Sequence, residues 1–123
     1  MPIDRREAAR QYKESPRTYG VAIVRNHVNG KHFVFAGIDI PALVNRHRAQ
    51  LKFSAHPNKL LQQEWNALGA DQFTFEIVDT LAPPEQDPLA DLREEVQALE
   101  AMWMEKLAPY DPNGYHRAPT ARG

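Results

Sequence analysis

The sequence predicts an α/β domain of the α+β type, in which a small three-stranded, mainly antiparallel sheet is flanked by helices. Within residues 19–37, two runs of β-branched and aromatic residues flank a single Asn-Gly pair, which is typical of a β-hairpin. Apolar and polar residues alternate over residues 73–77, which predicts a third strand. Elsewhere apolar residues recur every three or four positions, as on the buried side of a helix.

The predicted hairpin has a two-residue type I′ turn at Asn29-Gly30, because both residues tolerate the positive φ angles that this turn requires. A loop of this length would place Val24 opposite Phe35 and Ala22 opposite Gly37. One face of the hairpin would then carry Ala22, Val24, Phe33, Phe35 and Gly37. The other face would carry Val21, Ile23, Val34 and Ala36. Both faces are apolar, so we expect helices to cover the sheet on both sides.

One helix is predicted before the hairpin and one after it. The first covers residues 4–14 and ends at Ser15-Pro16, because a residue that precedes proline disfavours helical geometry. Asp39 can cap the second helix, which begins near Pro41, a residue type favoured in the first turn. The inward-facing positions of this helix would be Ile40, Val44, His47 and Leu51.

Two further helices flank the third strand. Asn58 can cap a helix that ends at Leu68, where Gly69 provides the stop. Its inward-facing positions would be Leu61, Trp65 and Leu68. The longest helix is expected to begin at Asp87-Pro88, after a loop over residues 81–88, and to reach about Leu107. Its inward-facing positions would be Leu89, Leu92, Val96, Leu99, Trp103 and Leu107.

The chain has 123 residues, which is long enough for one domain with a buried core. We expect an N-terminal arm or short helix over residues 1–18, the domain over 19–116 and a C-terminal tail over 117–123. No apolar run is long enough to span a membrane, and the start MPIDRRE lacks the apolar segment of a secretion signal. There is no cysteine, so disulfides and thiol chemistry are excluded. A cytoplasmic protein without membrane partners is therefore expected.

The net charge of −1 conceals an uneven distribution along the chain. Residues 18–60 carry six basic and one acidic side chain, whereas residues 61–111 carry two basic and twelve acidic. The basic part could bind phosphate groups, or its charges could simply be solvated. The predicted nucleic-acid-binding side chains are Arg25, Lys31, Arg46, Arg48, Lys52 and Lys59.

Four polar residues are candidates for a site or for structural roles. Glu100 borders the core stripe of the last helix, so its carboxylate needs either a structural partner or a function. His47 lies within the inward stripe of its helix, where a hydrogen-bonded core histidine is more frequent than a ligand. His56 is expected in a loop. His116 follows an Asn-Gly turn and either folds back on the sheet or lies in an exposed tail.

Several short motifs follow one another along residues 19–116. Residues 20–22 are Gly-Val-Ala and residues 35–37 are Phe-Ala-Gly, at the start and end of the predicted hairpin. Residues 66–69, 73–77 and 100–107 are NALG, FTFEI and EAMWMEKL. This order resembles the GIY-YIG nuclease family, which has a GIY triplet, a YIG triplet and the motifs N-x-x-G, F-x-F-E-I and E-x-x-W-I-x-x-L. The resemblance covers nearly the whole domain and implies a GIY-YIG-like fold.

The resemblance also implies a set of site residues. In the family, two tyrosines hold and activate the attacking water, an arginine supports the scissile phosphate and a glutamate binds one divalent metal. Glu100 falls on the metal-binding glutamate, so the implied cofactor is Mg²⁺ or Mn²⁺. His116 lies where the family often has an asparagine, and it is the second candidate metal ligand. Glu100, His47 and Arg46 are the candidate catalytic residues.

Three family positions carry other residues here. Ala22 and Phe35 stand where the two tyrosines would be, and Leu43 stands where the arginine would be if His47 matches the family histidine. Arg46 could replace the lost guanidinium, although it is expected to project in a different direction from Leu43. Because a positioned acid–base group typically contributes about 10²–10⁴-fold, the family reaction should be nearly abolished.

Three functions are compatible with these residues. The first is a degenerate nuclease-like domain that binds nucleic acid or a partner without efficient cleavage. The second is an enzyme on a small-molecule ligand, in which the cleft is enlarged and His47, Glu100 and His116 converge on a transition metal. The third is a residually active, metal-dependent endonuclease in which Arg46 or Tyr19 compensates, although Tyr19 should point to the opposite face from Ala22.

Overall fold

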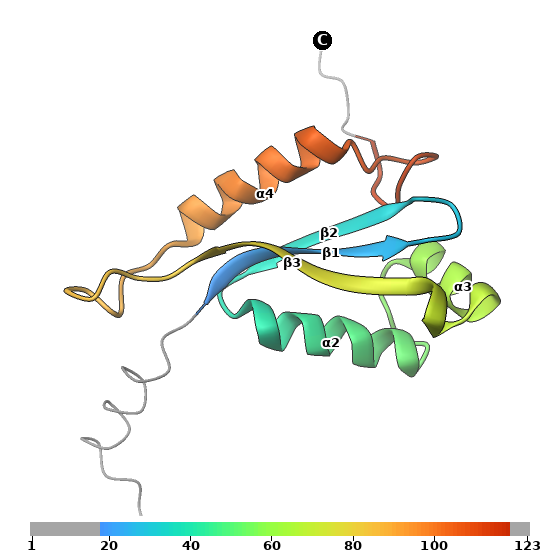
Figure 1. Ribbon diagram of the computed structural model, residues 1–123, viewed down its shortest axis with the longest axis horizontal. Coiled ribbons are helices and arrows are strands. Elements are labelled where there is room, and N and C mark those ends of the chain that lie inside the picture. The colour runs from blue at the N-terminus through green and yellow to red at the C-terminus, as the bar shows by residue number, and fades with distance from the viewer. Residues whose placement is uncertain (1–17, 119–123) are drawn as a thin grey trace, which may run out of the picture.

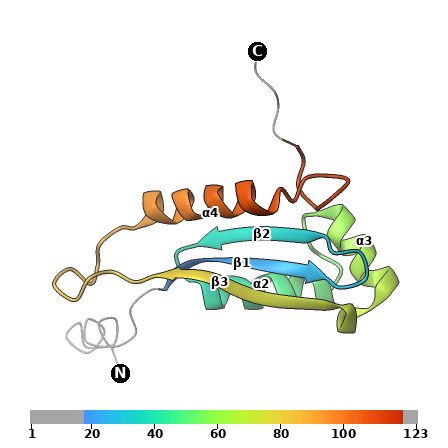
Figure 2. The ribbon, with the colours of Figure 1, turned by 45° about the horizontal axis from the view of Figure 1, so that its top comes forward.

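The computed structural model describes residues 18–118, and the predicted helix over residues 4–14 lies outside this part. The elements are β1 (Tyr19–Asn26), β2 (His32–Gly37), α2 (Ile40–Lys52), α3 (Lys59–Leu68), the short 3₁₀ helix η1 (Ala70–Gln72), β3 (Phe73–Leu81) and α4 (Arg93–Leu107). The strand order is β2-β1-β3, and both strand pairs are antiparallel. As Figure 1 and Figure 2 show, α2 and α3 lie on one side of the sheet and α4 lies on the other. The predicted α+β fold is confirmed.

The hairpin register differs from the prediction by two residues. Ala22 lies opposite Phe35 and Val24 lies opposite Phe33, so the predicted Val24–Phe35 and Ala22–Gly37 pairs are wrong. The loop is longer than a type I′ turn because the carbonyl oxygen of Asn26 accepts a hydrogen bond from the Gly30 N–H at 2.8 Å. A shift of an even number of residues leaves every side chain on its predicted face.

Asparagine side chains stabilise this longer loop. The Asn26 side-chain oxygen accepts a hydrogen bond from the Val28 N–H at 2.9 Å, and the Asn29 side-chain oxygen accepts one from the Lys31 N–H at 3.0 Å. Gly30 has the positive φ, 77°, that the sequence predicts for it. These two side-chain bonds satisfy the N–H groups of Val28 and Lys31, which in a two-residue turn would have paired between the strands.

Two hydrophobic cores lie on the two faces of the sheet, as the apolar pattern of the hairpin predicts. The first core, between the sheet and α2 and α3, consists of Ala22, Val24, Phe35, Ile40, Val44, Leu51, Leu61, Phe73 and Tyr115. The second core, between the sheet and α4, consists of Tyr19, Val21, Ile23, Val34 and Val96, with Leu92, Leu99, Trp103 and Leu107 packed against it. Leu68, predicted to be buried, is exposed at the end of α3.

The last helix begins later than predicted, at Arg93 rather than at Asp87-Pro88. The Ala90 N–H donates to the Asp87 carbonyl oxygen in a turn, and the Asp91 side chain accepts a hydrogen bond from the Arg93 N–H at 3.0 Å. The helix therefore starts after Leu92, which has no side-chain capping bond, and Asp91 satisfies the N–H of the first helical residue. Leu89 precedes the helix and is exposed, so its predicted place in the core is wrong.

After α4 the chain returns to the outer edge of β2. The Tyr115 N–H donates to the His32 carbonyl oxygen at 3.2 Å, which places Tyr115 in the first core. A Cβ at Gly114 would overlap the backbone of Pro109, so this close return requires glycine. The Asn26 amide donates to the Tyr115 hydroxyl at 2.9 Å and ties the returning segment to the hairpin.

Candidate functional site

The two positions that would carry the tyrosines are buried in the first core. Ala22 has an exposed fraction of 0% and Phe35 one of 6%, and the two residues face each other across β1 and β2. The predicted shared face is therefore confirmed. However, Ala22 is fully buried and α4, which carries Glu100, lies on the other face of the sheet (Figure 1), so among the described residues Ala22, Phe35, His47 and Glu100 do not line one common cavity as expected.

Two histidines beside these core residues form a direct hydrogen bond. His47 Nδ1 lies 2.8 Å from His56 Nε2, and the His47 ring centroid lies 4.1 Å from that of Phe35. His56 Nδ1 accepts a hydrogen bond from the Asn58 N–H at 3.0 Å, so the proton of a neutral His56 must lie on Nε2. His56 then donates to His47 Nδ1, which leaves the proton of His47 on its other nitrogen, Nε2.

His116 completes this aromatic group at the edge of β2. Its ring stacks on that of Phe33 with centroids 4.8 Å apart and an interplanar angle of 3°. His116 Nε2 accepts a hydrogen bond from the Val34 N–H at 2.8 Å. Of the two outcomes that the sequence left open, the structure has His116 folded back on the sheet, where it satisfies a donor on the edge of β2.

Burial lowers the pKa of all three histidines of this group, His47, His56 and His116. For His47 the pKa falls to about 4, first because burial disfavours the imidazolium and then because of the nearby His56 and Arg46. All three rings are therefore neutral at pH 7. Neutral rings can make the hydrogen bonds described above, whereas a charged ring would lose its acceptor nitrogen.

We expect the stability of the protein to decrease as the pH falls from about 6.5 to about 4. Because the pKa of His47 is lower in the folded state than in the unfolded state, the unfolded chain takes up the proton first, and stability present above pH 6.5 is lost on acidification. The half-exposure of the ring limits the loss from His47 to roughly 1–2 kcal/mol. Urea unfolding at a series of pH values between 7.5 and 4.5 measures this loss of unfolding free energy.

The matched variants for this prediction are His47→Asn and His27→Asn. Asparagine at position 47 keeps an acceptor near Nδ1 but does not titrate, so the pH dependence should become shallower. His27 is exposed on the hairpin loop, outside the group of His47, His56 and His116, and its replacement is the control for the loss of a surface histidine. An equal pH dependence in wild type and His47→Asn would contradict the attribution of the acid-induced loss of stability to His47.

Glu100 lies on the other side of the sheet from the histidines. It is half-buried on α4, the helix that packs on the second core, and burial raises the pKa of its carboxyl. No residue in the range 18–118 forms a hydrogen bond or an ion pair with it. The structural partner that the sequence allowed for is thus not found among these residues, and a function for Glu100 stays a prediction.

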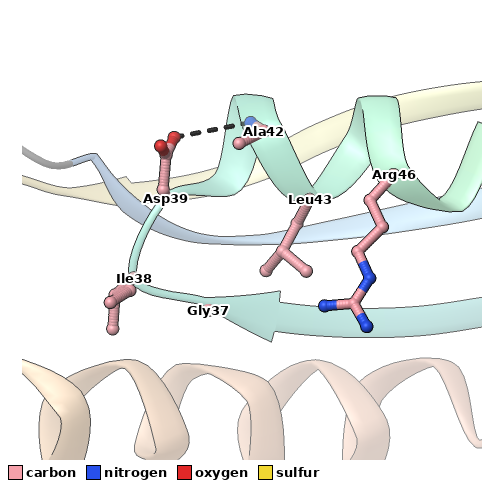
Figure 3. Close-up of a pocket in the computed structure, with 6 residues that line it drawn as sticks. All are labelled: Gly37, Ile38, Asp39, Ala42, Leu43 and Arg46. Atoms are coloured by element: carbon pink, nitrogen blue, oxygen red, sulfur yellow. Dashed lines mark hydrogen bonds between the residues drawn. The ribbon is translucent and has the colours of Figure 1, made fainter.

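A pocket of about 420 Å³ lies where β2 ends and α2 begins. Its lining residues are Gly37, Ile38, Asp39, Ala42, Leu43 and Arg46. Figure 3 shows Leu43 and Arg46 extending from α2 to the same side, towards β2, so the expectation that they project in different directions is wrong. Residues three apart on a helix share a side. Leu43 packs directly on Gly37, while Arg46 brings a positive charge to this edge.

The predicted cationic residues do not form one surface. Arg25 is paired with Glu76 at 3.8 Å and Lys31 with Glu64 at 3.4 Å, so the acidic partners neutralise them. Four others are exposed on α2 and α3 and make no ion pair with any residue of 18–118: Arg46, Arg48, Lys52 and Lys59. Arg48 and Lys52 line a different pocket from Arg46, beside β3.

The described residues do not assemble the predicted three-ligand metal site. Between residues 18 and 118 no three His, Asp or Glu side chains are grouped so that they could hold a metal ion. His47 and Glu100 lie on opposite layers, and His116 Nε2 already accepts a hydrogen bond from Val34. Glu100 alone could offer one carboxylate to a divalent ion, so we derive no reaction step through a metal.

Tyr19 cannot take over the role of the missing tyrosines. It belongs to the second core, on the opposite face from Ala22, as the strand periodicity predicts. Its hydroxyl donates to the Ala90 carbonyl oxygen at 3.3 Å. On the first-core face, burial raises the pKa of Tyr115, whose hydroxyl is hydrogen-bonded to Asn26. Both hydroxyls are thus engaged in hydrogen bonds within the fold.

His56 is the residue of this group whose role the sequence does not predict. It was expected in a loop, which is correct, but it is buried there and bonded to His47. Gln62 holds it in place, because its side-chain oxygen accepts a hydrogen bond from the His56 N–H at 3.0 Å. The sequence offers only a weak signal for this role, namely a histidine two residues before a helix cap. The cap residue is Asn58, and its N–H orients the His56 ring by donating to Nδ1.

Comparison with known proteins supports the fold. Two solved structures of one protein are similar to this chain: the catalytic domain of the homing endonuclease I-TevI, a GIY-YIG nuclease, and a mutant of that domain. The first has 24% sequence identity and a TM-score of 0.65 and covers 82% of this chain and 99% of its own. The second has 22% identity and a TM-score of 0.64 and covers 86% and 99%. The chain therefore has a GIY-YIG-like fold.

Two other comparisons add no further relative. No protein-family model matches the sequence, and no curated protein matches it significantly. Among residues 18–118, no helix has the length and apolar character that crossing a membrane requires.

Proposed function

We propose that this chain is a nucleic-acid-binding domain that uses a GIY-YIG-like nuclease fold without performing efficient cleavage. The observation that carries this proposal is the burial of Ala22 and Phe35 at the two tyrosine positions. Neither side chain has a hydroxyl, and neither is open to a substrate. The fold is thus retained while the two groups that would position a water are replaced by hydrocarbon in the first core.

The arginine position supports the same conclusion. Leu43 lies against Gly37 and presents an aliphatic side chain to the pocket at the end of β2. Arg46 lines this pocket, but Asp39 lines it as well. The Asp39 carboxylate accepts a hydrogen bond from the Ala42 N–H and points away from Leu43 and Arg46 in Figure 3, so Arg46 is the sole cation among lining residues that are otherwise mostly apolar. One guanidinium beside aliphatic side chains concentrates less positive charge on a phosphate than the family site does.

The distribution of charge over the layers supports nucleic-acid binding. The layer of α2 and α3 presents four exposed cations, Arg46, Arg48, Lys52 and Lys59. The layer of α4 presents exposed acids, among them Glu94, Glu95 and Glu105. A polyanion would be attracted to the first layer and repelled from the second, although the net charge is only −1.

We therefore expect binding to DNA or RNA that weakens steeply with salt. Each cation that contacts a phosphate contributes about 0.9 to the slope of log K against log salt for duplex DNA and about 0.7 for single strands. Replacing Arg46, Arg48, Lys52 and Lys59 by glutamine should reduce the slope by roughly 2 to 4. Fluorescence anisotropy over a series of salt concentrations measures this slope.

Arg93→Gln is the matched control for this experiment. Arg93 is exposed at the start of α4 and is paired with Asp91 at 3.6 Å, so its loss should leave the slope unchanged. Binding that does not respond to salt, or the absence of binding to duplex and single strands alike, would refute the proposed function.

A further inference from the structure

A second pocket lies beside β3, on the opposite edge of the sheet from β2. It has a volume of about 600 Å³, within the usual range of ligand sites. Its lining residues are Arg48, Lys52, Trp65, Ala70, Phe73, Thr74 and Phe75. Residues from α2, α3, η1 and β3 therefore meet here, around a strand edge that pairs with no other described strand.

The interior of this pocket is aromatic. The Trp65 ring centroid lies 5.2 Å from that of Phe73 and 6.2 Å from that of Phe75. Phe73 is buried, whereas Trp65 and Phe75 are partly exposed. A flat ligand group could thus reach the two outer rings while the third supports them from the core.

The cations of the pocket are held close to aromatic rings. The guanidinium carbon of Arg48 lies 4.8 Å from the centroid of Phe75. The Lys52 ammonium lies 5.9 Å from the centroid of Phe53, whose side chain is 74% exposed. Both cations are exposed and make no ion pair with a residue of 18–118, so they are available to an anionic ligand.

We propose that this pocket binds single-stranded nucleic acid, with an unpaired base against Trp65 and Phe75 and the backbone phosphates on Arg48 and Lys52. Aromatic rings beside cations are the combination that such ligands need, because each base has a flat face and each linkage a negative charge. Bases of a duplex are stacked on one another and cannot enter a pocket. This inference rests on the proposed function, since it takes nucleic acid as the ligand. It adds that the nucleic acid is single-stranded and that it binds in the pocket beside β3.

The two tryptophans of the chain allow a direct test, because they lie on opposite layers. Trp65 lines the pocket, whereas Trp103 packs on the second core and donates to Asp79 at 3.3 Å. The Trp103→Phe variant keeps Trp65 as its sole tryptophan, and the Trp65→Phe variant keeps Trp103. Circular dichroism of both variants verifies folding before any titration.

The ligands for the test are fluorescein-labelled oligothymidylate and the same strand annealed to oligoadenylate. In Trp103→Phe, the single strand should quench the emission of Trp65. The midpoint of this quenching titration should equal the midpoint of the anisotropy titration. In Trp65→Phe, the emission of Trp103 should not change, and the affinity should fall by less than the roughly 5- to 150-fold, about 1–3 kcal/mol, that loss of a whole stacking ring costs, because phenylalanine keeps a smaller ring. The duplex should bind more weakly than the single strand.

Charge variants complete the design. Arg48→Gln together with Lys52→Gln should reduce the salt slope for the single strand by about 1.4. The matched control is Lys106→Gln, since the Lys106 ammonium lies 4.7 Å from the centroid of Trp103 on the α4 layer. This control forms the same kind of cation–aromatic pair away from the pocket and should leave the slope unchanged.

Failure of this inference and failure of the proposed function give different results. Binding by anisotropy without quenching of Trp65, equal quenching of Trp103, or a duplex affinity equal to that of the single strand overturns the pocket assignment and leaves nucleic-acid binding in place. No binding of either ligand by wild type overturns both.

Discussion

Incubation of the protein with plasmid DNA or single-stranded oligonucleotides in Mg²⁺ or Mn²⁺ should give no cleavage above background. A lost acid–base group typically costs about 10²–10⁴-fold, and a lost electrostatic donor costs about 10²–10³-fold. With alanine, phenylalanine and leucine at positions 22, 35 and 43, the combined loss relative to a complete site should be at least about 10⁴-fold. Gel electrophoresis after long incubation measures the residual rate.

The Glu100→Ala variant separates true activity from contamination in this assay. Glu100 is the family's metal-binding position by resemblance, and its carboxyl is half-buried with a raised pKa. Cleavage that persists in Glu100→Ala belongs to a contaminating nuclease. Cleavage that is present in wild type and lost in Glu100→Ala would contradict the proposed function and would show that another residue, such as Arg46, performs the missing work.

The faces of the hairpin could be predicted from the sequence, whereas its register could not. Alternation of side chains places Ala22 and Phe35 on one face for any even shift, so the contribution of the hairpin to each core follows from periodicity. The register depends on the loop, and there the side chains of Asn26 and Asn29 accept backbone hydrogen bonds. An Asn-Gly pair predicts a tight turn but cannot show that a nearby asparagine stabilises a longer one.

The candidate site is less predictable because its contacts join distant parts of the chain. His47 could be placed on the inward side of α2 from spacing. Its bond to His56 depends on how the chain turns between α2 and α3, and its neighbour His116 reaches Phe33 only because the segment after α4 returns to β2. Helical and strand periods carry no information about such contacts, so the sequence does not predict the grouping of His47, His56 and His116.

The basic and acidic segments of the sequence contribute helices to opposite layers of the fold. The basic segment 18–60 contributes α2, and the acidic segment 61–111 contributes α4, which lies on the other layer (Figure 2). However, the hairpin cations of this segment are paired with acids from the second segment, Arg25 with Glu76 and Lys31 with Glu64. Of the six predicted cations, only the four on α2 and α3 therefore remain without an ion pair to a described residue.

Restoring the first tyrosine of the family pattern should destabilise the fold rather than restore a site. Ala22 is fully buried in the central strand, opposite Phe35 on one side and Ile77 on the other. Ala22→Tyr must displace packed neighbours, which costs about 1–3 kcal/mol or more, and must bury a hydroxyl, which costs about 1–3 kcal/mol without a partner. Urea unfolding should show a loss of about 3 kcal/mol or more, a large part of typical domain stability.

Phe35→Tyr is the matched comparison, because it restores the other family tyrosine by adding one hydroxyl to a ring that is already present. Phe35 is 6% exposed and lies beside His47, so the loss should be about 1 kcal/mol and clearly smaller than that of Ala22→Tyr. A stable Ala22→Tyr protein would show that the first core leaves room for a phenol, and the closed cleft would no longer explain inactivity. If the expected order holds, the core has packed around the alanine, and no single reversion at that position can rebuild the catalytic face.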